Sequence, residues 1–210
     1  MIEQLLTFFV VFLVVVEPIS VIPIFIALTE GDSEQDRRRM ARKGVLVAAG
    51  ILLVFSLVGG PFLRVMSISI DAFRIFGGLL LFLIALEMVF ARPSGTRTSS
   101  PEEEEGKRRP DISVFPLAFP FIAGPGALAT ILLAFGPASG NWVLTLGLLA
   151  CVAVVLVIAL LTLYLAAPIM RVMGVTGANV LGRLFGVVLG ALAVQYVLDG
   201  LRGSFPQLHP

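Results

Sequence analysis

Six apolar windows dominate this sequence, and each is about as long as the roughly 20 residues that a helix needs to cross a bilayer. The chain has 210 residues, of which 58% are hydrophobic and 14% are charged, and its mean hydropathy is +1.01. A water-soluble domain of this size has no core large enough for so much apolar surface. We therefore predict an all-α membrane protein with six transmembrane helices. The windows cover approximately residues 4–28, 44–63, 72–91, 112–135, 142–166 and 180–201.

Two strongly polar connectors, residues 30–43 and 91–111, separate some of these windows. The second connector is rich in Pro, Gly, Ser and acidic residues, a composition typical of a disordered surface loop. It divides the chain into two halves of three windows each. We predict a single transmembrane domain (1–210) made of a first three-helix repeat (1–91), a polar cytoplasmic loop (92–111) and a second three-helix repeat (112–210).

The basic residues lie mainly on one side of the predicted membrane. Twelve of the 15 Lys and Arg residues follow the first, third and fifth windows or begin the sixth, and the other three are Arg64, Arg74 and Arg202. Because cytoplasmic loops are enriched in Lys and Arg, we predict that both termini lie outside the cytoplasm. We assign the cluster RRRMARK (37–43) to this topogenic role, and recognition of anionic lipid is the alternative, because basic clusters also bind anionic lipids.

The start of the chain bears on whether the first window is removed as a signal peptide. The chain opens MIEQLL, without the basic start of a signal peptide, so we expect the first window to be retained.

The two halves of the sequence resemble each other. FRIFGGLLLFLIALEMV (73–89) aligns without gaps with GRLFGVVLGALAVQYVL (182–198), and the alignment pairs Arg74 with Arg183. The openings of the halves match more loosely, EPISVIPIF against PFIAGPGAL. Because each half has three windows, the second must be inverted relative to the first. Inverted repeats with interrupted helices are typical of secondary transporters that bind substrate near the bilayer midplane, although chance similarity between apolar helices is the alternative.

The fourth window contains a cluster of helix-breaking residues. Pro120, Gly124, Pro125 and Gly126 cannot all lie in one uninterrupted helix, because proline lacks the N–H donor and clashes with the preceding turn. We predict that this helix is interrupted near the midplane. The free N–H groups that begin its second half suit an anionic group such as a substrate carboxylate. A proline kink that only shapes packing is the alternative.

Glu17 lies within the first window, followed by Pro18. It is about 13 to 15 residues into the window, roughly 20 Å of helix rise, so it cannot easily reach either surface. An acid at this depth could bind an ammonium group, couple a proton or help to hold a cation, or it could be a structural latch beside Pro18. We predict interruption of this helix too. The predicted substrate-binding residues are Glu17, Pro18, Ser20, Pro23, Pro120, Gly124, Pro125, Gly126 and Thr130.

Further polar and small residues have proposed roles in gating and packing. Arg74 and Arg183 would lie near opposite mouths of one pathway if the repeats are inverted, and there they could attract a carboxylate or pair with gate acids. Interfacial anchoring, with Asp71 as the partner of Arg74 at i+3 spacing, explains them equally well. Gly182, Gly186 and Gly190 have the spacing of close helix contacts, within the bundle or between protomers of a homo-oligomer.

Several functional classes find no support in the sequence. Cys151 is the only cysteine and His209 the only histidine, so counting excludes a disulfide and a Cys/His metal site. A net charge of +1 offers no electrostatic surface for nucleic acid. Neither a nucleophile elbow nor a phosphate-binding glycine loop is present. We predict no enzyme activity, no cofactor and no bound metal.

Three runs carry a family resemblance: FPLAFPFIAGPGALAT (115–130), FRIFGGLLLFLIALEM in the third window and RLFGVVLGALAVQYVLDG in the sixth. They resemble the MarC family of bacterial and archaeal inner-membrane proteins, which includes the SnatA-type small neutral amino acid transporters of the LysE-like group. The resemblance covers nearly the whole chain apart from 92–111 and implies six spans in a prokaryotic inner membrane. The sequence departs from the family after Pro18, because Val21 stands where the family usually has an amide side chain.

The resemblance and the interruptions together favour a secondary transporter of small neutral amino acids, importer or exporter, working by alternating access. The substrate carboxylate would bind amides near Gly124 and Gly126, and its ammonium would bind near Glu17, with a proton or sodium ion as coupling ion. Two alternatives stay open. One is a non-transporting scaffold or assembly factor that recruits partners through 30–43 and 91–111, and the other is a channel-like pore.

Overall fold

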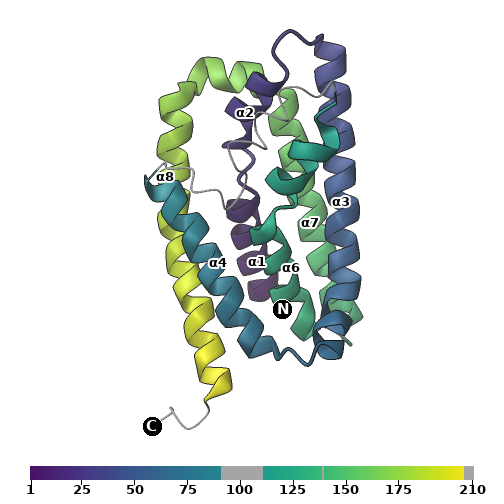
Figure 1. Ribbon diagram of the computed structural model, residues 1–210, viewed down its shortest axis with the longest axis vertical. Coiled ribbons are helices and arrows are strands. Elements are labelled where there is room, and N and C mark those ends of the chain that lie inside the picture. The colour runs from purple at the N-terminus through teal and green to yellow at the C-terminus, as the bar shows by residue number, and fades with distance from the viewer. Residues whose placement is uncertain (91–110, 139, 206–210) are drawn as a thin grey trace.

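The computed structural model describes residues 1–90, 111–138 and 140–205, and within these ranges it contains helices and no strands (Figure 1). Most of the polar loop predicted at 92–111 lies outside the described residues, as does His209. The helices are α1 (Ile2–Val16), α2 (Val21–Leu28), α3 (Glu34–Val65), α4 (Ile70–Phe90), η1 (Ser113–Ile122), α6 (Pro125–Ala138), α7 (Trp142–Tyr164) and α8 (Ala166–Ser204).

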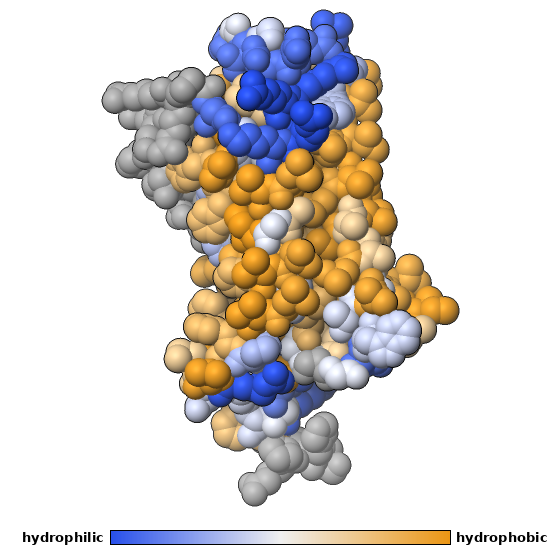
Figure 2. Space-filling model, turned by 90° about the vertical axis from the view of Figure 1, so that its right-hand side faces the viewer, coloured by the Kyte–Doolittle hydropathy of each residue, from blue (hydrophilic) through white to orange (hydrophobic). Residues whose placement is uncertain are grey.

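These helices form five or six stretches that are long and apolar enough to cross a membrane. Five of them are Ile2–Leu28, Glu34–Val65, Ile70–Phe90, Trp142–Tyr164 and Thr176–Ser204, and the sixth is η1 with α6, which are bent by 56° relative to each other. We number them in chain order, so that η1 with α6 is the fourth apolar stretch. The all-α membrane fold expected from the sequence is therefore confirmed at this level. Figure 2 shows a broad apolar belt between polar ends on the α3 side of the molecule.

Two helices extend beyond the windows expected from the sequence. α3 begins at Glu34, inside the polar connector, because Ser33 caps it: the N–H of Asp36 donates to Oγ of Ser33 at 3.1 Å. α8 begins at Ala166 and is interrupted at Gly174, where φ is 63° and ψ is 175°. Hydropathy did not locate the start of α3, because its polar turns carry no apolar signal, and it placed the start of the sixth window after the break at Gly174.

The two ends of the bundle differ in charge. The start of α1 and the end of α8 lie toward the lower end of Figure 1, which we call the terminal end. The start of α3 lies at the opposite end, which we call the basic end because it carries Arg37, Arg38, Arg39, Arg42 and Lys43. The predicted orientation of these ends relative to the cytoplasm stays a prediction.

α4 and α8 pack backbone against backbone. A Cβ atom added at Gly78 would lie 2.7 Å from the carbonyl oxygen of Ala193, and one added at Gly186 would lie 3.0 Å from that of Ala85. Glycine is therefore required on both helices for this approach. The close helix contact predicted for Gly186 is confirmed.

Several other packing contacts are related by an exchange of apolar stretches. α3 packs on η1 and α6, and α1 packs on α7. α4 packs on α6, and α8 packs on α1 and α2. Exchanging the first apolar stretch with the fourth, the second with the fifth and the third with the sixth relates these contacts of α3 to that of α1, and that of α4 to those of α8, whereas the contacts of α7 with α6 and with α8 do not follow this pattern. Figure 1 shows α1 and α4 ascending while α6 and α8 descend.

Candidate functional site

The first apolar stretch leaves helical geometry at Glu17. α1 ends at Val16, and Glu17 takes left-handed backbone angles, φ 48° and ψ 61°, which are uncommon outside glycine. Pro18 explains this break, because it has no N–H to continue the helix and disfavours α geometry in the residue before it. A turn follows, in which the N–H of Ser20 donates to the carbonyl of Glu17 at 3.1 Å, and α2 then begins at Val21.

The Glu17 side chain is buried in a small polar cluster. Only 4% of Glu17 is exposed, and Oγ of Ser20 donates a hydrogen bond of 2.5 Å to its Oε1. On the other side lies α8, where a Cβ atom added at Gly182 would approach Oε1 to 3.0 Å and Oγ of Ser20 to 3.5 Å. We call Glu17, Ser20 and Gly182 the Glu17 cluster. It places a carboxylate and a hydroxyl from the first apolar stretch against the backbone of the sixth.

The fourth apolar stretch begins with wide, irregular turns. In η1 the N–H of Leu117 donates to the carbonyl of Ile112, five residues earlier, and the chain is extended at Phe115 and Phe119. Each of these phenylalanines precedes a proline, which disfavours α geometry at that position. The segment is anchored to α3 because Gly44 leaves room for Leu117: a Cβ atom added at Gly44 would lie 2.6 Å from its Cδ2.

A sharp bend joins η1 to α6. α6 starts at Pro125, a first helical position where the missing N–H of proline has no consequence. Gly124 precedes it, and a Cβ atom added there would lie 2.3 Å from the carbonyl oxygen of Pro120. No side chain fits at this position without a shift of the backbone, so the bend requires glycine.

The two breaks lie near each other in the fold. A Cβ atom added at Gly126 would lie 3.1 Å from Cγ1 of Val15 and 2.7 Å from Cδ1 of Ile84. Thr130 is fully buried, and its Oγ1 donates to the carbonyl of Gly126 at 2.9 Å. Apolar side chains therefore face the start of α6, and the predicted use of its amides for a carboxylate stays a prediction.

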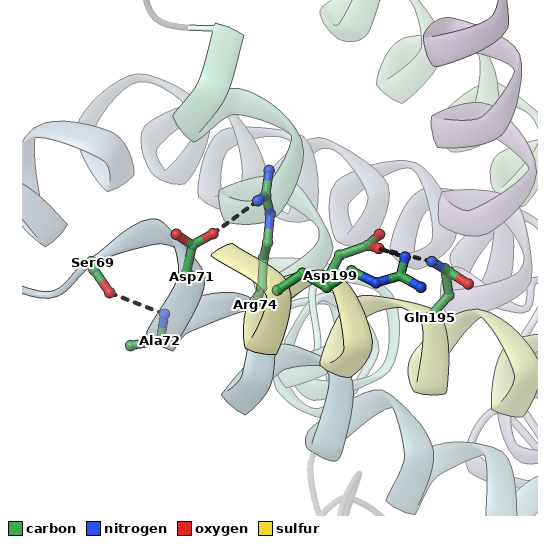
Figure 3. Close-up of polar contacts among 7 residues, drawn as sticks. Ser69, Asp71, Ala72, Arg74, Gln195 and Asp199 are labelled. Atoms are coloured by element: carbon green, nitrogen blue, oxygen red, sulfur yellow. Dashed lines mark hydrogen bonds and ion pairs between the residues drawn. The ribbon is translucent and has the colours of Figure 1, made fainter. Parts of the chain in front are cut away.

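A cavity of about 390 Å³ opens at the terminal end. Its polar lining includes Glu3, Arg74 and Tyr196, with Phe8 among its apolar residues. Nη1 of Arg74 lies 2.9 Å from Oδ1 of Asp71, so the predicted i+3 ion pair is present (Figure 3).

A polar seam on α8 lies beside that ion pair in Figure 3. Nε2 of Gln195 donates to Oδ1 of Asp199 at 2.8 Å, and Nη1 of Arg202 lies 3.6 Å from the same oxygen. The two elements meet closely, because a Cβ atom added at Gly203 would lie 2.4 Å from the carboxylate carbon of Asp71. The rim of the terminal-end cavity thus joins α4 to the end of α8.

A second cavity, of about 340 Å³, opens at the basic end. It lies between the end of α2, the start of α3 and the junction of α7 with α8, and its lining includes Phe25, Thr29, Arg37 and Tyr164. Nε of Arg37 donates to the carbonyl of Thr29 at 3.0 Å. The chain has two tyrosines, and each lines one of the two cavities.

Arg183 differs from its predicted counterpart Arg74. It follows Gly182 on α8, but its side chain is exposed, and within the described parts of the chain no carboxylate lies at salt-bridge distance from it. Its predicted gating role stays untested. In those same parts of the chain, no group of three or more His, Cys, Asp or Glu residues could hold a metal ion.

Three residues at these sites had no predicted role there. Gly182 was expected only to allow close helix contact, yet it adjoins the carboxylate of Glu17. Tyr164 and Tyr196 were not singled out, although the enrichment of tyrosine at membrane interfaces could have drawn attention to them.

Comparison with known proteins matches the chain to one family of membrane proteins. A family model described as "MarC family integral membrane protein" matches residues 2–205. The chain is 37% identical to UPF0056 membrane protein MJ1677 of Methanocaldococcus jannaschii, over 90% of this chain and 92% of that protein. It is 36% identical to YvbG of Bacillus subtilis (91% and 90%) and 31% identical to YhcE of Escherichia coli (96% and 93%), both also named UPF0056 membrane proteins. No solved structure matches.

Proposed function

Because the chain belongs to the MarC family of integral membrane proteins, we propose that it is a secondary transporter of small neutral amino acids that works by alternating access. The family consists of multi-pass membrane proteins, and the relatives named above are prokaryotic. Their names give a membrane location and no substrate. The proposal therefore depends on the site.

The single observation that carries the proposal is the buried carboxylate of Glu17. Burial of an acid in an apolar bundle is unfavourable unless hydrogen bonds or counter-charges stabilise it, and such acids mark substrate or ion pathways in membrane proteins. Glu17 lies at a helix break, is 4% exposed and accepts a hydrogen bond from Ser20. A carboxylate in this place suits the ammonium group of an amino acid, or a coupling proton or sodium ion.

The two cavities support alternating access. The terminal-end cavity reaches Phe8 of α1, and the basic-end cavity reaches Phe25 of α2. Glu17 lies between these residues in the chain, and the fully buried side chains of Phe12 and Ile22 flank it in sequence on either side. We interpret this arrangement as an occluded conformation, in which the two cavities lie on either side of Glu17 and would extend to it when the bundle opens.

The surroundings of the breaks favour a small, uncharged substrate side chain. Val15 and Ile84 lie against Gly126 and leave an apolar surface beside the start of α6. The first N–H groups of a helix have no carbonyl four residues earlier and carry partial positive charge. The substrate carboxylate would bind there, at Gly124 and Gly126, after α6 moves away from these side chains.

An inverted repeat gives this mechanism its symmetry, and we include it in the proposal. The exchange pattern of the packing contacts and the opposite directions of α1 and α6 support it. Because the basic end carries the cluster of Arg37, Arg38, Arg39, Arg42 and Lys43, that end would face the cytoplasm and both termini would lie on the other side.

The direct test is transport by the purified protein in liposomes. We expect exchange of labelled glycine, alanine or serine, and little exchange of arginine or glutamate. Glu17→Gln keeps the shape of the side chain but removes its charge, and it should abolish exchange. Glu30→Gln is the matched control, because Glu30 is exposed in the α2–α3 connector, and it should leave exchange unchanged. Failure of folded wild-type protein to exchange any of these substrates, or full activity of Glu17→Gln, would contradict the proposal.

A further inference from the structure

A polar cavity lies on the outside of the basic end, at the seam between α3 and α7. Its volume is about 710 Å³, and it is lined by Glu34, Gln35, Arg38, Arg39 and Arg42 of α3 and by Tyr164 of α7. The proposed transport mechanism does not use Arg39 or Arg42. Three arginines around one cavity indicate an anionic ligand.

Arg38 holds the two walls of this cavity together. Its Nη2 lies 2.5 Å from Oε1 of Glu34, and its guanidinium carbon lies 5.9 Å from the centre of the Tyr164 ring. Arg38 is therefore already paired with Glu34, and its guanidinium lies between α3 and the Tyr164 ring of α7. It forms a side of the cavity and leaves the other two arginines to meet a ligand.

Arg39 and Arg42 carry the uncompensated positive charge. Within the ranges 1–90, 111–138 and 140–205, neither has a carboxylate at salt-bridge distance. They are spaced i, i+3, so they lie on neighbouring positions of one helix face. An anion bound here would be stabilised by both arginines.

An apolar groove continues the cavity along the same seam. Its volume is about 430 Å³, and it is lined by Val45, Leu46, Ala49 and Leu53 of α3 and by Leu149, Val152, Ala153, Leu156, Val157 and Leu160 of α7. On α3 the groove begins one turn after Arg42, and on α7 it ends one turn before Tyr164. The polar cavity and the apolar groove are therefore adjacent along the seam between α3 and α7. Figure 2 shows the polar region of the basic end directly above the apolar belt on this side of the molecule.

We propose that this seam binds one anionic phospholipid, with its phosphate at Arg39 and Arg42 and an acyl chain in the groove. A soluble anion would leave the groove empty, and a zwitterionic headgroup would leave the two arginines uncompensated. The small side chains of Ala49 and Ala153 lie on opposite walls of the groove and make it hollow, which ordinary contact with bulk lipid does not require. The bound lipid would join α3 to α7 and so stabilise the fold. This proposal does not depend on the transport proposal.

The first experiment compares lipids by the thermal stability of the full chain in detergent. A ligand that binds only the folded protein raises the unfolding temperature. We expect a rise with phosphatidylglycerol, no comparable rise with phosphatidylcholine at the same mole fraction, and none with inorganic phosphate. Equal stabilisation by the two lipids would overturn the anionic headgroup, and full stabilisation by inorganic phosphate would overturn the lipid.

The second experiment places the lipid with variants. Arg39→Gln combined with Arg42→Gln should weaken phosphatidylglycerol binding about tenfold or more, because basic residues at an anionic lipid surface each contribute measurably to binding. Ala153→Phe should fill the groove and have a similar effect, although it leaves both arginines in place. The control is Arg171→Gln, on the exposed surface of α8 outside the cavity, which should bind lipid as the wild type does. Unchanged binding in the double arginine variant and in Ala153→Phe would place the lipid elsewhere.

Discussion

The two breaks in the bundle differ in chemistry although they lie in corresponding apolar stretches. At the first break the carboxyl group of Glu17 and the hydroxyl of Ser20 form a hydrogen bond, and the backbone of Gly182 on α8 lies close to both. At the second break no ionisable side chain is present, and Gly124 lies against the carbonyl of Pro120. One break therefore supplies polar side chains, and the other supplies a tight backbone bend.

The two breaks should therefore respond differently to substitution. Prolines occur in both breaks, where they interrupt helical geometry. An acidic side chain occurs in the first break alone, and a second buried acid nearby would make ionisation of either one less favourable. Substitutions at the second break should therefore mainly strain the backbone, whereas substitutions at the first should mainly change the contacts of the Glu17 side chain.

The largest effect is expected for Gly124→Ala. Its Cβ atom would meet the carbonyl oxygen of Pro120 at 2.3 Å, so the backbone of the bend must shift, and we expect a loss of about 3 kcal/mol of unfolding free energy. Denaturation in mixed micelles measures this. Gly50→Ala is the control, because no atom lies within 4 Å of a Cβ atom there, and it should be neutral or slightly stabilising. Equal stability of the two variants would show that the second break is not a tight bend.

A smaller effect is expected for Ser20→Ala. The variant removes the hydrogen bond that Oγ of Ser20 donates to Oε1 of Glu17, and leaving this buried acceptor without that donor lowers stability by about 2 kcal/mol. The control is Ser56→Ala, which removes a buried bond to the neutral carbonyl of Leu52 and should lower stability by about 1 kcal/mol. If Ser20→Ala loses no more stability than Ser56→Ala, the hydrogen bond from Ser20 to Glu17 does not distinguish the first break.

Gly182→Ala is expected to have a modest effect. Its Cβ atom would lie 3.0 Å from Oε1 of Glu17, so the carboxylate must move by a few tenths of an ångström, with a loss of about 1 kcal/mol. Gly190→Ala, on the same helix, places its Cβ atom 3.6 Å from that of Ala85, an ordinary contact, and should not lower stability. Thermal unfolding compares the two variants. A loss of stability in Gly190→Ala but not in Gly182→Ala would contradict the close approach of α8 to Glu17.

The smallest effect is expected at Asp111, which anchors the start of the fourth apolar stretch. Oδ2 of Asp111 lies 2.6 Å from Nζ of Lys43, and this bond, followed by the bonds from Ser113, lowers the pKa of the carboxyl group to about 2. The pair is about half exposed, so Asp111→Asn should lower stability by less than about 0.5 kcal/mol at neutral pH.

The pH dependence of that contribution has a definite sign. Because folding lowers the pKa of Asp111 from 3.8 to about 2, the contribution is complete above pH 4 and is lost as the pH falls through 2. The stability difference between wild type and Asp111→Asn should therefore shrink between pH 4 and pH 2. A difference that grows on acidification would contradict the assignment.

Local chemistry made much of this structure predictable. The apolar windows located the long helices, and Pro18 and Pro125 located the places where helices end or begin. The wide turns of η1 were not predictable, because they depend on the space that Gly44 of α3 leaves for Leu117. The approach of Gly182 to Glu17 was not predictable either, because the two residues are far apart in the sequence and no local pattern indicates their contact.

The backbone contact between α4 and α8 limits how the protein can move. Sliding one of these helices past the other would bring residues that carry a Cβ atom against the carbonyls of Ala193 and Ala85, where only glycine fits. The relative position of α4 and α8 is therefore constrained. If the bundle opens as the proposed transport mechanism requires, the other helices are expected to move relative to this pair.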